Sequence, residues 1–505
     1  MRYRRFLAGF VFVTGMAVTA IEITASRALA PFFGTSLFVW ANVIGVVLLA
    51  LALGYSIGGR LADRQPSVRL LAILTLTAGV VSAIIPVAVR AVATSLLAAT
   101  TIVSAVLIVL SLLATLVLFF PPVFLLGMVT PFAIRLTTHD VGTSGRVAGN
   151  LFAASTVGSI LGVMLPAFVT IPLLGVRETF FLASGLLIIA ASLLFGRRAP
   201  LAALALAVPI VLFFATRGTP LRPGERVLDE RDSAYQYIRV VEDDDGIRSL
   251  RINDGLGVQS LYRDDLLLYD SYFDYYSVLP YLLTPRTDLK VLLVGLAGGT
   301  IARQYDEIVG KDFSITMDGV EIDPEVVQTA REYFALDRGI LNVHVADGRA
   351  FVAASAERYD IIIVDAYTQQ IYIPPHLTTA EFFGAARERL GDNGVFAINI
   401  NVFQDDAELL ARMLATLAGV FPEVRFARLP DLTNVLVMAS NEPLEYDDVA
   451  ARVPELIRPQ ALVVSNAAPP SERQRNASAF SDNRAPIELL TESMFFDLLL
   501  KLNHG

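Results

Sequence analysis

The chain has 505 residues, 54% of them hydrophobic, and a formal net charge of −9 at pH 7. Soluble domains contain about 45–50% apolar residues, so this excess indicates membrane-spanning segments. Residues 1–200 hold 13 Arg but only 4 acidic residues, whereas the whole chain has 40 basic and 49 acidic residues. An acidic second half argues against nucleic acid as a partner, because phosphate neutralisation needs clustered Lys and Arg. Cysteine is absent and the four histidines lie far apart, so we expect no disulfide and no metal.

Six apolar runs are long enough to cross a bilayer, which takes about 20 residues in an α-helix. They lie near residues 6–29, 38–59, 70–90, 149–170, 178–196 and 200–216. A further stretch, 97–135, contains Pro121 and Pro122 and is either one kinked helix or two spans. The sequence therefore predicts a multi-pass protein of the cell (inner) membrane, with residues 1–218 as a helical transmembrane domain and the lipid bilayer as a partner.

The number of spans decides on which side the second half lies. Arg2, Arg4 and Arg5 favour a cytoplasmic N-terminus. Seven spans then place the second half outside, and eight spans place it inside. The distribution of arginines alone favours seven.

The composition changes near residue 220, at the Pro- and Gly-containing sequence TPLRPGER. Residues 226–262 alternate polar and apolar side chains, which predicts a small β domain over 219–285 with Asp245-Gly246 as a hairpin turn. After Lys290, buried β-runs such as KVLLVG and YDIIIVDAY alternate with helical stretches. This alternation predicts a doubly wound, mostly parallel α/β sheet of the Rossmann-like methyltransferase type over 286–505.

Ligands of such sheets bind beyond the C-terminal ends of the strands. A glycine-rich loop with Gly295, Gly298 and Gly299 follows the first strand and lets the backbone approach a ligand closely. Glu321 ends the second strand, where an acid can accept hydrogen bonds from two ribose hydroxyls. Each feature alone also fits a packing loop or a solvated charge. The loop lacks the full G-x-G-x-x-G pattern, so NAD is the poorer ligand.

Two more acids follow at the next strand ends. Asp347 with Gly348 ends the third strand, where a carboxylate can meet an adenine amino group, although an Asp before Gly is also common in turns. Asp365 ends the fourth strand and can take a proton from an attacking amine. Taken in order at successive strand ends, these residues predict a binding site for a nucleoside of the S-adenosylmethionine type.

Residues 226–440 resemble the spermidine synthases, the polyamine aminopropyltransferases. The resemblance runs through SAYQ with Gln236, INDGLGVQS with Asp254 and Gln259, VLLVGLAGGT, VEID, ADGR and YDIIIVDAY. A β-hairpin domain ahead of the nucleotide fold is part of the pattern, and ordinary methyltransferases lack it. The apolar first half is similar to the membrane-fused branch of this family.

The resemblance implies that decarboxylated S-adenosylmethionine donates an aminopropyl group to a diamine or polyamine and leaves as methylthioadenosine. Glu321 would hold the ribose, Asp347 the adenine, and Asp365 would be the base. The family's tyrosine near the amine falls at Tyr272 when the sequence is aligned backward from Leu279-Pro280, and an insertion after Gln259 makes Tyr269 nearly as good. The remaining residues that the resemblance assigns are Gln236 on the donor side and Asp254, Gln259 and Tyr367 on the amine side.

Two positions depart from the family pattern. Ala297 replaces the Asp of GGGDGG that contacts the donor's amino group, and Thr368 replaces the second Asp of the DSSDP loop. Two alternatives therefore stay open: a methyltransferase, and a polyamine transporter or sensor with a non-catalytic nucleoside-binding domain. Because free adenosyl-sulfonium metabolites are cytosolic, we expect a cytoplasmic soluble domain. The oligomeric state stays open, with a homodimer among the options.

Overall fold

The computed structural model describes residues 2–98, 104–138, 140–216, 226–253, 257–368, 372–404, 407–430 and 432–494. The chain divides into two compact units. One holds Met1–Gly224 with Glu230–Tyr237, and the other holds Glu225–Asp229 with Ile238–Gly505. Each unit is described by itself below.

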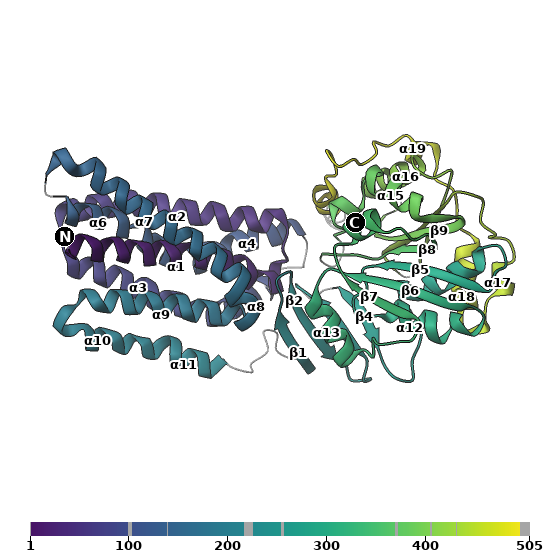
Figure 1. Cartoon of the computed structure of the whole chain (residues 1–505), viewed down its shortest axis with the longest axis horizontal. Helices are drawn as coiled ribbons and strands as arrows, with labels where there is room; N and C mark the ends of the chain where they lie inside the picture. Colours follow the sequence, from purple (N-terminus) through teal and green to yellow (C-terminus); the bar gives the residue numbers. More distant parts are fainter. Residues whose placement is uncertain are drawn as a thin grey trace. The chain divides into compact units, whose positions relative to one another are not determined.

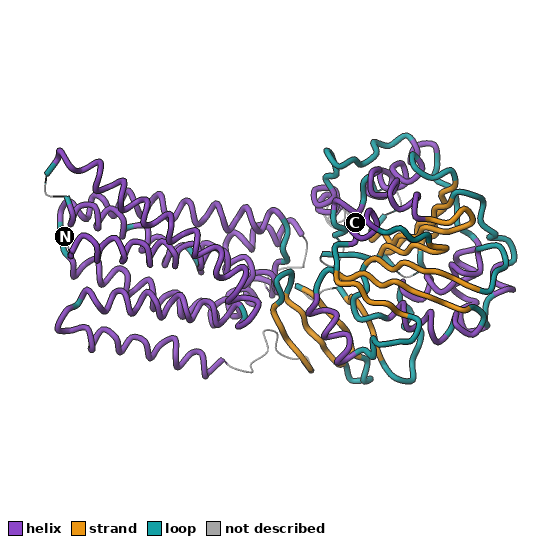
Figure 2. The backbone as a smooth tube through the Cα atoms, viewed as in Figure 1, coloured by secondary structure: helices purple, strands orange, loops and turns teal. Residues whose placement is uncertain are grey.

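Helices make up the first unit as far as residue 216 (Figures 1 and 2). Its longest members are α1 (Arg2–Phe33), α2 (Leu37–Arg64), α3 (Val68–Ala98), α7 (Ser144–Leu165) and α9 (Val176–Leu194). The shorter ones are α4 (Ser104–Leu118), α5 (Phe120–Gly127), α6 (Val129–Thr137), α8 (Ile171–Leu174), α10 (Ala199–Ala203) and α11 (Ala207–Thr216).

Seven helical stretches among the described residues are long and apolar enough to cross a membrane. They are Arg4–Phe33, Leu37–Arg64, Val68–Leu96, Phe120–Thr137, Ser144–Leu174, Val176–Leu194 and Gly196–Thr216. The six apolar runs expected from the sequence overlap six of these stretches. The stretch at 97–135 is interrupted at Phe119 and Met128, and it contributes Phe120–Thr137 and a shorter apolar helix, Ile108–Leu118.

Small residues allow α1 and α7 to cross closely. A Cβ added to Gly158 would lie 2.0 Å from the main-chain oxygen of Phe12, so only glycine fits. About two turns after Phe12 on α1, Thr19 Oγ1 donates to the main-chain oxygen of Ser159 at 2.9 Å. Small residues and hydroxyl groups at crossings are typical of helices packed in lipid, where burial of apolar surface does not drive association.

A four-stranded sheet of order β1-β2-β3-β4 follows the helices: β1 (Arg226–Asp232), β2 (Tyr237–Glu242), β3 (Arg248–Ile252) and β4 (Val258–Tyr262). The expected Asp245-Gly246 turn lies between β2 and β3. Asp243 closes this turn, because its side chain accepts hydrogen bonds from the main-chain nitrogens of Asp245 and Ile247 at 3.0 and 2.8 Å. Gly246 takes the left-handed φ of 76° that the turn requires.

A seven-stranded sheet forms the centre of the second unit (Figures 1 and 2). Its order is β10-β11-β9-β8-β5-β6-β7, and every pair is parallel except those of β11. This confirms the expected mostly parallel α/β fold. The strands are β5 (Asp288–Val294), β6 (Ser314–Glu321), β7 (Leu341–Val345), β8 (Tyr359–Val364), β9 (Leu390–Asn401), β10 (Glu423–Arg428) and β11 (Asn434–Ser440).

Helices cover both faces of this sheet and bury a separate apolar core on each. One core includes the 3₁₀ helix η5 (Tyr272–Leu282), α12 (Thr300–Glu307), α13 (Pro324–Tyr333), α17 (Val449–Arg452) and α18 (Arg458–Ser465). The other includes α14 (Gly348–Ala354), α15 (Ala380–Arg389) and α16 (Glu408–Ala418), and the short α19 (Glu472–Arg475) lies beyond it in the chain. The strand order reverses between β5 and β8, which is where such sheets form a ligand crevice.

Candidate active site

The glycine-rich loop after β5 lies against the chain that follows β8. Gly295 has a φ of 93°, and its nitrogen donates to the main-chain oxygen of Val320 at 2.9 Å. A Cβ at Gly295 would lie 2.4 Å from the main-chain oxygen of Asp365. The two strand ends at the reversal point therefore meet directly, and the absence of a side chain at Gly295 permits this contact.

Replacing Gly295 with alanine is expected to destabilise the second unit by about 2 kcal/mol or more, because the new side chain adds a backbone clash to an unfavourable φ. It should also displace Asp365 and lower activity. Gly384→Ala is the matched control, since a Cβ there meets no atom within 4 Å and alanine favours the helix. Thermal unfolding in detergent measures both. Equal melting temperatures for Gly295→Ala and the parent would contradict the assigned contact.

The other glycines of the loop also lie close to their neighbours. The nitrogen of Gly298 donates to Ser260 Oγ at 2.8 Å, which fastens the loop to β4. Gly299 has a φ of 82° and forms the N-cap of α12. Ala297, which directly precedes these two glycines, takes a left-handed φ of 46° and donates its main-chain N–H to Glu321 Oε2 at 3.1 Å.

Glu321 ends β6 and is only 8% exposed. Its two carboxylate oxygens accept main-chain N–H groups, Oε2 from Ala297 and Oε1 from Asp323, each at 3.1 Å. Burial raises the pKa of Glu321 to about 7, and these backbone hydrogen bonds oppose the rise. Because each carboxylate oxygen has a second lone pair, the group keeps the capacity to accept two hydroxyl groups.

Asp347 forms the N-cap of α14. This agrees with the alternative interpretation of Asp347 from the sequence, in which it is an Asp of a turn. Its Oδ1 accepts the main-chain N–H of Ala350 at 2.8 Å, and its Oδ2 lies 3.3 Å from His376 Nε2. Asp347 remains 37% exposed at its side chain. Gly348, next in the chain, is in contact with β5, because a Cβ there would lie 2.4 Å from Val294 Cγ1.

Asp365 follows β8 and is buried beside two tyrosines of η5. Its Oδ2 accepts a hydrogen bond from the Tyr272 hydroxyl at 3.2 Å, whereas its buried Oδ1 accepts none from the residues that the structure describes. Burial raises the pKa of Asp365 to about 7, and the hydroxyls of Tyr272 and Tyr276 oppose the rise. A carboxyl group that titrates near neutral pH with one oxygen unused is suited to proton transfer.

The structure separates the two tyrosines that the sequence left as alternatives. Tyr272 touches Asp365, but Tyr269 is bound in the loop after β4, where its hydroxyl donates to the main-chain oxygen of Leu266 at 2.9 Å and accepts from the nitrogen of Arg263 at 3.0 Å. Of the two, only Tyr272 is placed beside the candidate base.

Tyr272→Phe is expected to lower turnover about 10- to 100-fold, because it removes a hydrogen bond to a buried charged group. The same hydrogen bond lowers the pKa of Asp365, so the variant should need a higher pH to reach its maximal rate. A pH–rate profile of turnover measures both effects. Tyr269→Phe serves as the control and should leave the profile in place. Similar profiles for parent and Tyr272→Phe would contradict this role.

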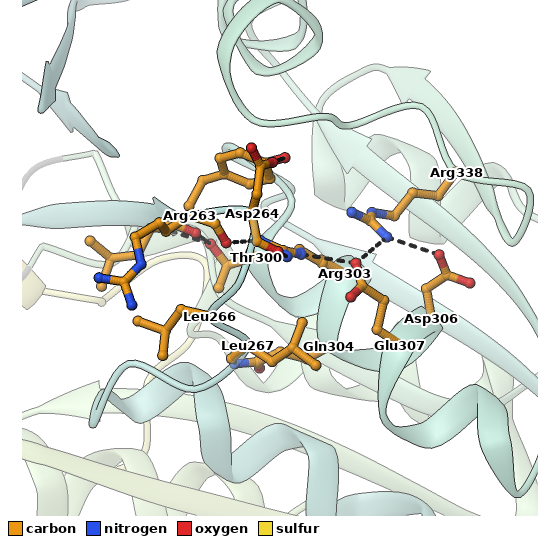
Figure 3. A network of polar contacts seen from close by, with 12 residues as sticks. Arg263, Asp264, Leu266, Leu267, Thr300, Arg303, Gln304, Asp306, Glu307 and Arg338 are labelled. Atoms are coloured by element: carbon orange, nitrogen blue, oxygen red, sulfur yellow. Dashed lines mark hydrogen bonds and ion pairs between the residues drawn. The ribbon is translucent and has the colours of Figure 1, made fainter. Parts of the chain in front are cut away.

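Helix α12 fastens the loop that leads to Tyr272 (Figure 3). Arg303, which is 4% exposed, donates to the main-chain oxygens of Arg263 and Asp264 at 2.7 Å each. Its Nε also donates to Glu307 Oε1 at 2.9 Å, and Glu307 is held in turn by Arg338 at 2.9 Å. The glycine-rich loop therefore leads into α12, and the same helix holds the loop between β4 and Tyr272.

The next residue of α12 reaches the start of η5. Gln304 Nε2 donates to the main-chain oxygen of Leu267 at 2.9 Å and to Asp274 Oδ1 at 2.6 Å. Asp274 Oδ2 accepts the main-chain N–H of Ser271 at 3.3 Å, which caps the turn that begins with Tyr272. Buried hydrogen bonds therefore determine where the Tyr272 hydroxyl lies.

The other residues assigned from the sequence are more dispersed. Tyr367 points its hydroxyl to the main-chain oxygen of Asn399 at 2.7 Å, and Thr368 is held by Asn253, whose Nδ2 donates to its main-chain oxygen at 2.9 Å. Gln259 lies half-buried on β4. Gln236 belongs to the first unit, in a turn closed by Ser233, so its assignment to the donor stays a prediction. Asp254 lies outside the described residues.

Sequence reasoning missed two side chains of this region. Tyr276, whose side chain is fully buried, lies next to Tyr272 with ring centroids 6.4 Å apart. The four-residue spacing of the two tyrosines in SYFDYY was the available signal. His376 beside Asp347 had no such signal, because 29 positions separate them in the chain.

A mostly parallel sheet with a glycine-rich loop after β5, an acid ending β6 and further acids after β7 and β8 defines the Rossmann-like class of α/β enzymes. Residues 279–440 match the family model of the spermine/spermidine synthase domain. A polyamine aminopropyltransferase of Chromobacterium violaceum is 30% identical over 207 residues, which are 39% of this chain and 74% of that protein. The chain belongs to the polyamine aminopropyltransferase, or spermidine synthase-like, family.

One further relative and one solved structure are also similar to this chain, and the matches cover different shares of their lengths. A probable polyamine aminopropyl transferase of Bifidobacterium longum is 36% identical over 208 residues, so the match spans 41% of this chain and only 45% of that protein. The crystal structure of a probable spermidine synthase from Corynebacterium glutamicum is 18% identical, with a TM-score of 0.40, and the match covers 52% of this chain and 99% of that chain.

Proposed function

We propose that this chain is a membrane-bound aminopropyltransferase that moves an aminopropyl group from decarboxylated S-adenosylmethionine to a diamine or polyamine. The observation that carries the proposal is the buried pair of Tyr272 and Asp365, placed at the strand reversal and directly against the glycine-rich loop. A proton acceptor at this point is what transfer to an amine requires, since an amine attacks only through its unprotonated nitrogen.

In the proposed reaction, the amine nitrogen forms a bond to the aminopropyl carbon next to the sulfonium. The carbon–sulfur bond breaks, its electron pair stays on sulfur, and methylthioadenosine leaves. The proton that the amine loses passes to Oδ1 of Asp365, the oxygen that accepts no hydrogen bond from the described residues. Tyr272 keeps the carboxylate oriented through Oδ2.

Donor binding is assigned to the neighbouring strand ends. Glu321 accepts hydrogen bonds from the two ribose hydroxyls. Asp347 accepts a hydrogen bond from the adenine amino group through Oδ2, because its Oδ1 already accepts the main-chain N–H of Ala350 at the start of α14. The positions of Ala297 and Thr368 carry no charge here, so the amino groups of donor and acceptor meet fewer carboxylates than in soluble relatives. We therefore propose that Gln259, Tyr367 and the unplaced Asp254 contribute to acceptor recognition.

The seven apolar stretches support a location in the cell membrane. A catalytic unit in the cytoplasm, where the adenosyl donor is made, requires an eighth span, and we assign this span to the shorter apolar helix Ile108–Leu118. The test uses the full-length protein in detergent with decarboxylated S-adenosylmethionine and a panel of diamines and polyamines. Formation of methylthioadenosine together with an extended amine is the expected result. Donor binding without any product would favour a sensor or transporter, and methyl transfer from S-adenosylmethionine would favour a methyltransferase; either result would overturn the proposal.

A further inference from the structure

The segment after α19 is fixed to the second unit before it reaches the candidate site. Arg412 Nε donates to the main-chain oxygen of Ser478 at 2.8 Å, and its guanidinium lies 4.5 Å above the ring of the fully buried Phe480. The nitrogen of Phe480 donates to Thr416 Oγ1 at 2.9 Å, and its oxygen accepts from Ala380 at 3.0 Å. Residues 478–480 are thereby attached to α15 and α16.

Two residues further on, the carboxylate of Asp482 is bound by three donor groups. Arg349 donates from Nη1 to Oδ1 at 2.7 Å and from Nη2 to Oδ2 at 2.6 Å, which is a two-point contact between a planar guanidinium and a carboxylate. Thr379 Oγ1 adds a third hydrogen bond, at 2.8 Å. Arg349 and Thr379 hold the pKa of Asp482 at about 2, so the carboxylate stays ionised at neutral pH.

Arg349 also belongs to the turn assigned to the adenine. It is the second residue of α14, and Asp347 caps that helix. A further hydrogen bond of Arg349, 3.1 Å long, goes to the main-chain oxygen of His376, whose imidazole lies 3.3 Å from Asp347 Oδ2. Asp482 is therefore connected through Arg349 and His376 to the carboxylate oxygen that would receive the adenine.

This chain of contacts is partly open to solvent, as a ligand site requires. The exposed fractions of the side chains are 29% for Arg349, 43% for Asp482, 47% for His376 and 37% for Asp347. An exposed single ion pair contributes little to stability, but this one has two parallel hydrogen bonds, and its arginine belongs to the helix that Asp347 caps. Its effect is therefore expected on the position of the α14 turn more than on the stability of the fold.

We propose that Asp482 is a positioning residue for the adenosyl donor, and that it sets donor affinity by holding Arg349 and, with it, the turn of Asp347 and Gly348. This inference rests on the proposed function, because it takes Asp347 as the adenine-binding carboxylate. The C-terminal segment thus becomes part of the donor site without contacting the reacting atoms.

The test compares the parent, Asp482→Asn and Asp482→Glu as full-length proteins in detergent. Asp392→Asn is the matched control, because Asp392 pairs with Arg358 at 3.4 Å and is 84% exposed. Titration with methylthioadenosine should give a Kd about tenfold higher for Asp482→Asn than for the parent. Asp482→Glu should recover part of the affinity, and Asp392→Asn should match the parent. In turnover assays the donor KM should rise while kcat and the amine KM stay at parental values.

Each outcome decides the inference. Equal methylthioadenosine affinity in the parent and Asp482→Asn would overturn it and leave the proposed function intact. A loss of kcat and of melting temperature with an unchanged donor KM would also overturn it, since Asp482 would then only stabilise the fold. Absence of methylthioadenosine binding by the parent would instead remove the proposed function, and the inference with it.

Discussion

Asp365→Asn is expected to lower the rate of aminopropyl transfer about 10²- to 10⁴-fold, the range typical of a lost general base. An asparagine has the shape of the carboxylate and can still accept the Tyr272 hydroxyl, so methylthioadenosine should bind with parental affinity. Single-turnover assays with the donor and a diamine measure the loss, and calorimetric titration measures the affinity. A variant that keeps its rate would show that the proton leaves by another route.

The pH dependence has a defined direction. Because the pKa of Asp365 is raised to about 7 in the ligand-free protein, the parent's kcat/KM should fall roughly tenfold per pH unit below 7. Between its unfolded pKa of 3.8 and about 7, the folded protein holds a proton that the unfolded chain has lost. This carboxyl group therefore stabilises the fold at low pH and loses that contribution progressively as the pH rises from about 3.8 through 7. Asp365→Asn should raise the melting temperature more at pH 8 than at pH 5.

Glu321→Gln is expected to raise the Kd for methylthioadenosine about 100-fold. The glutamine NH₂ group would face the main-chain N–H of Ala297 or of Asp323, so two donors would meet where a donor now meets a carboxylate oxygen. The ribose hydroxyls would also lose a charged acceptor. Calorimetric titration of the full-length protein in detergent measures the change.

The control for this substitution is Glu357→Gln, which removes an exposed carboxylate paired with Lys290 at 2.6 Å on the same unit. It should bind methylthioadenosine as the parent does. If both variants bind equally and both melt cooperatively, Glu321 does not hold the ribose. The parent should also lose affinity as the pH falls below about 7, since burial raises the pKa of Glu321 to that value.

Much of the second unit could be predicted because its signals are local. The strands alternate with helices, and a parallel strand ends where its buried run ends, so Glu321, Asp347 and Asp365 could be placed at one edge of the sheet. The antiparallel pairs that β11 forms with β9 and β10 lie at one edge of the sheet, away from β5, β6 and β7. The fold and this row of acids therefore follow from periodicity and strand order.

The partners of these acids could not be predicted, because they depend on tertiary contacts between distant segments. Tyr272 and Tyr269 have similar sequence surroundings, and only the path of the loop held by Arg303 and Gln304 separates them. Likewise, 133 positions separate Arg349 from Asp482. In the apolar stretch at 97–135, Pro121 and Pro122 predicted a break, and the helix is interrupted just before them, at Phe119. The second interruption, at Met128, could not be predicted from composition, because Met128 is apolar itself.

The anchoring of the glycine-rich loop has a practical consequence for recombinant work. Gly298 depends on Ser260 for a main-chain hydrogen bond, and α12 fills its side-chain hydrogen bonds with the segment that follows β4. An expression clone that started at residue 286 would remove these partners and leave Arg303 without its carbonyl acceptors. Soluble fragments for crystallisation should therefore retain β4, which contains Ser260, and the segment that follows it.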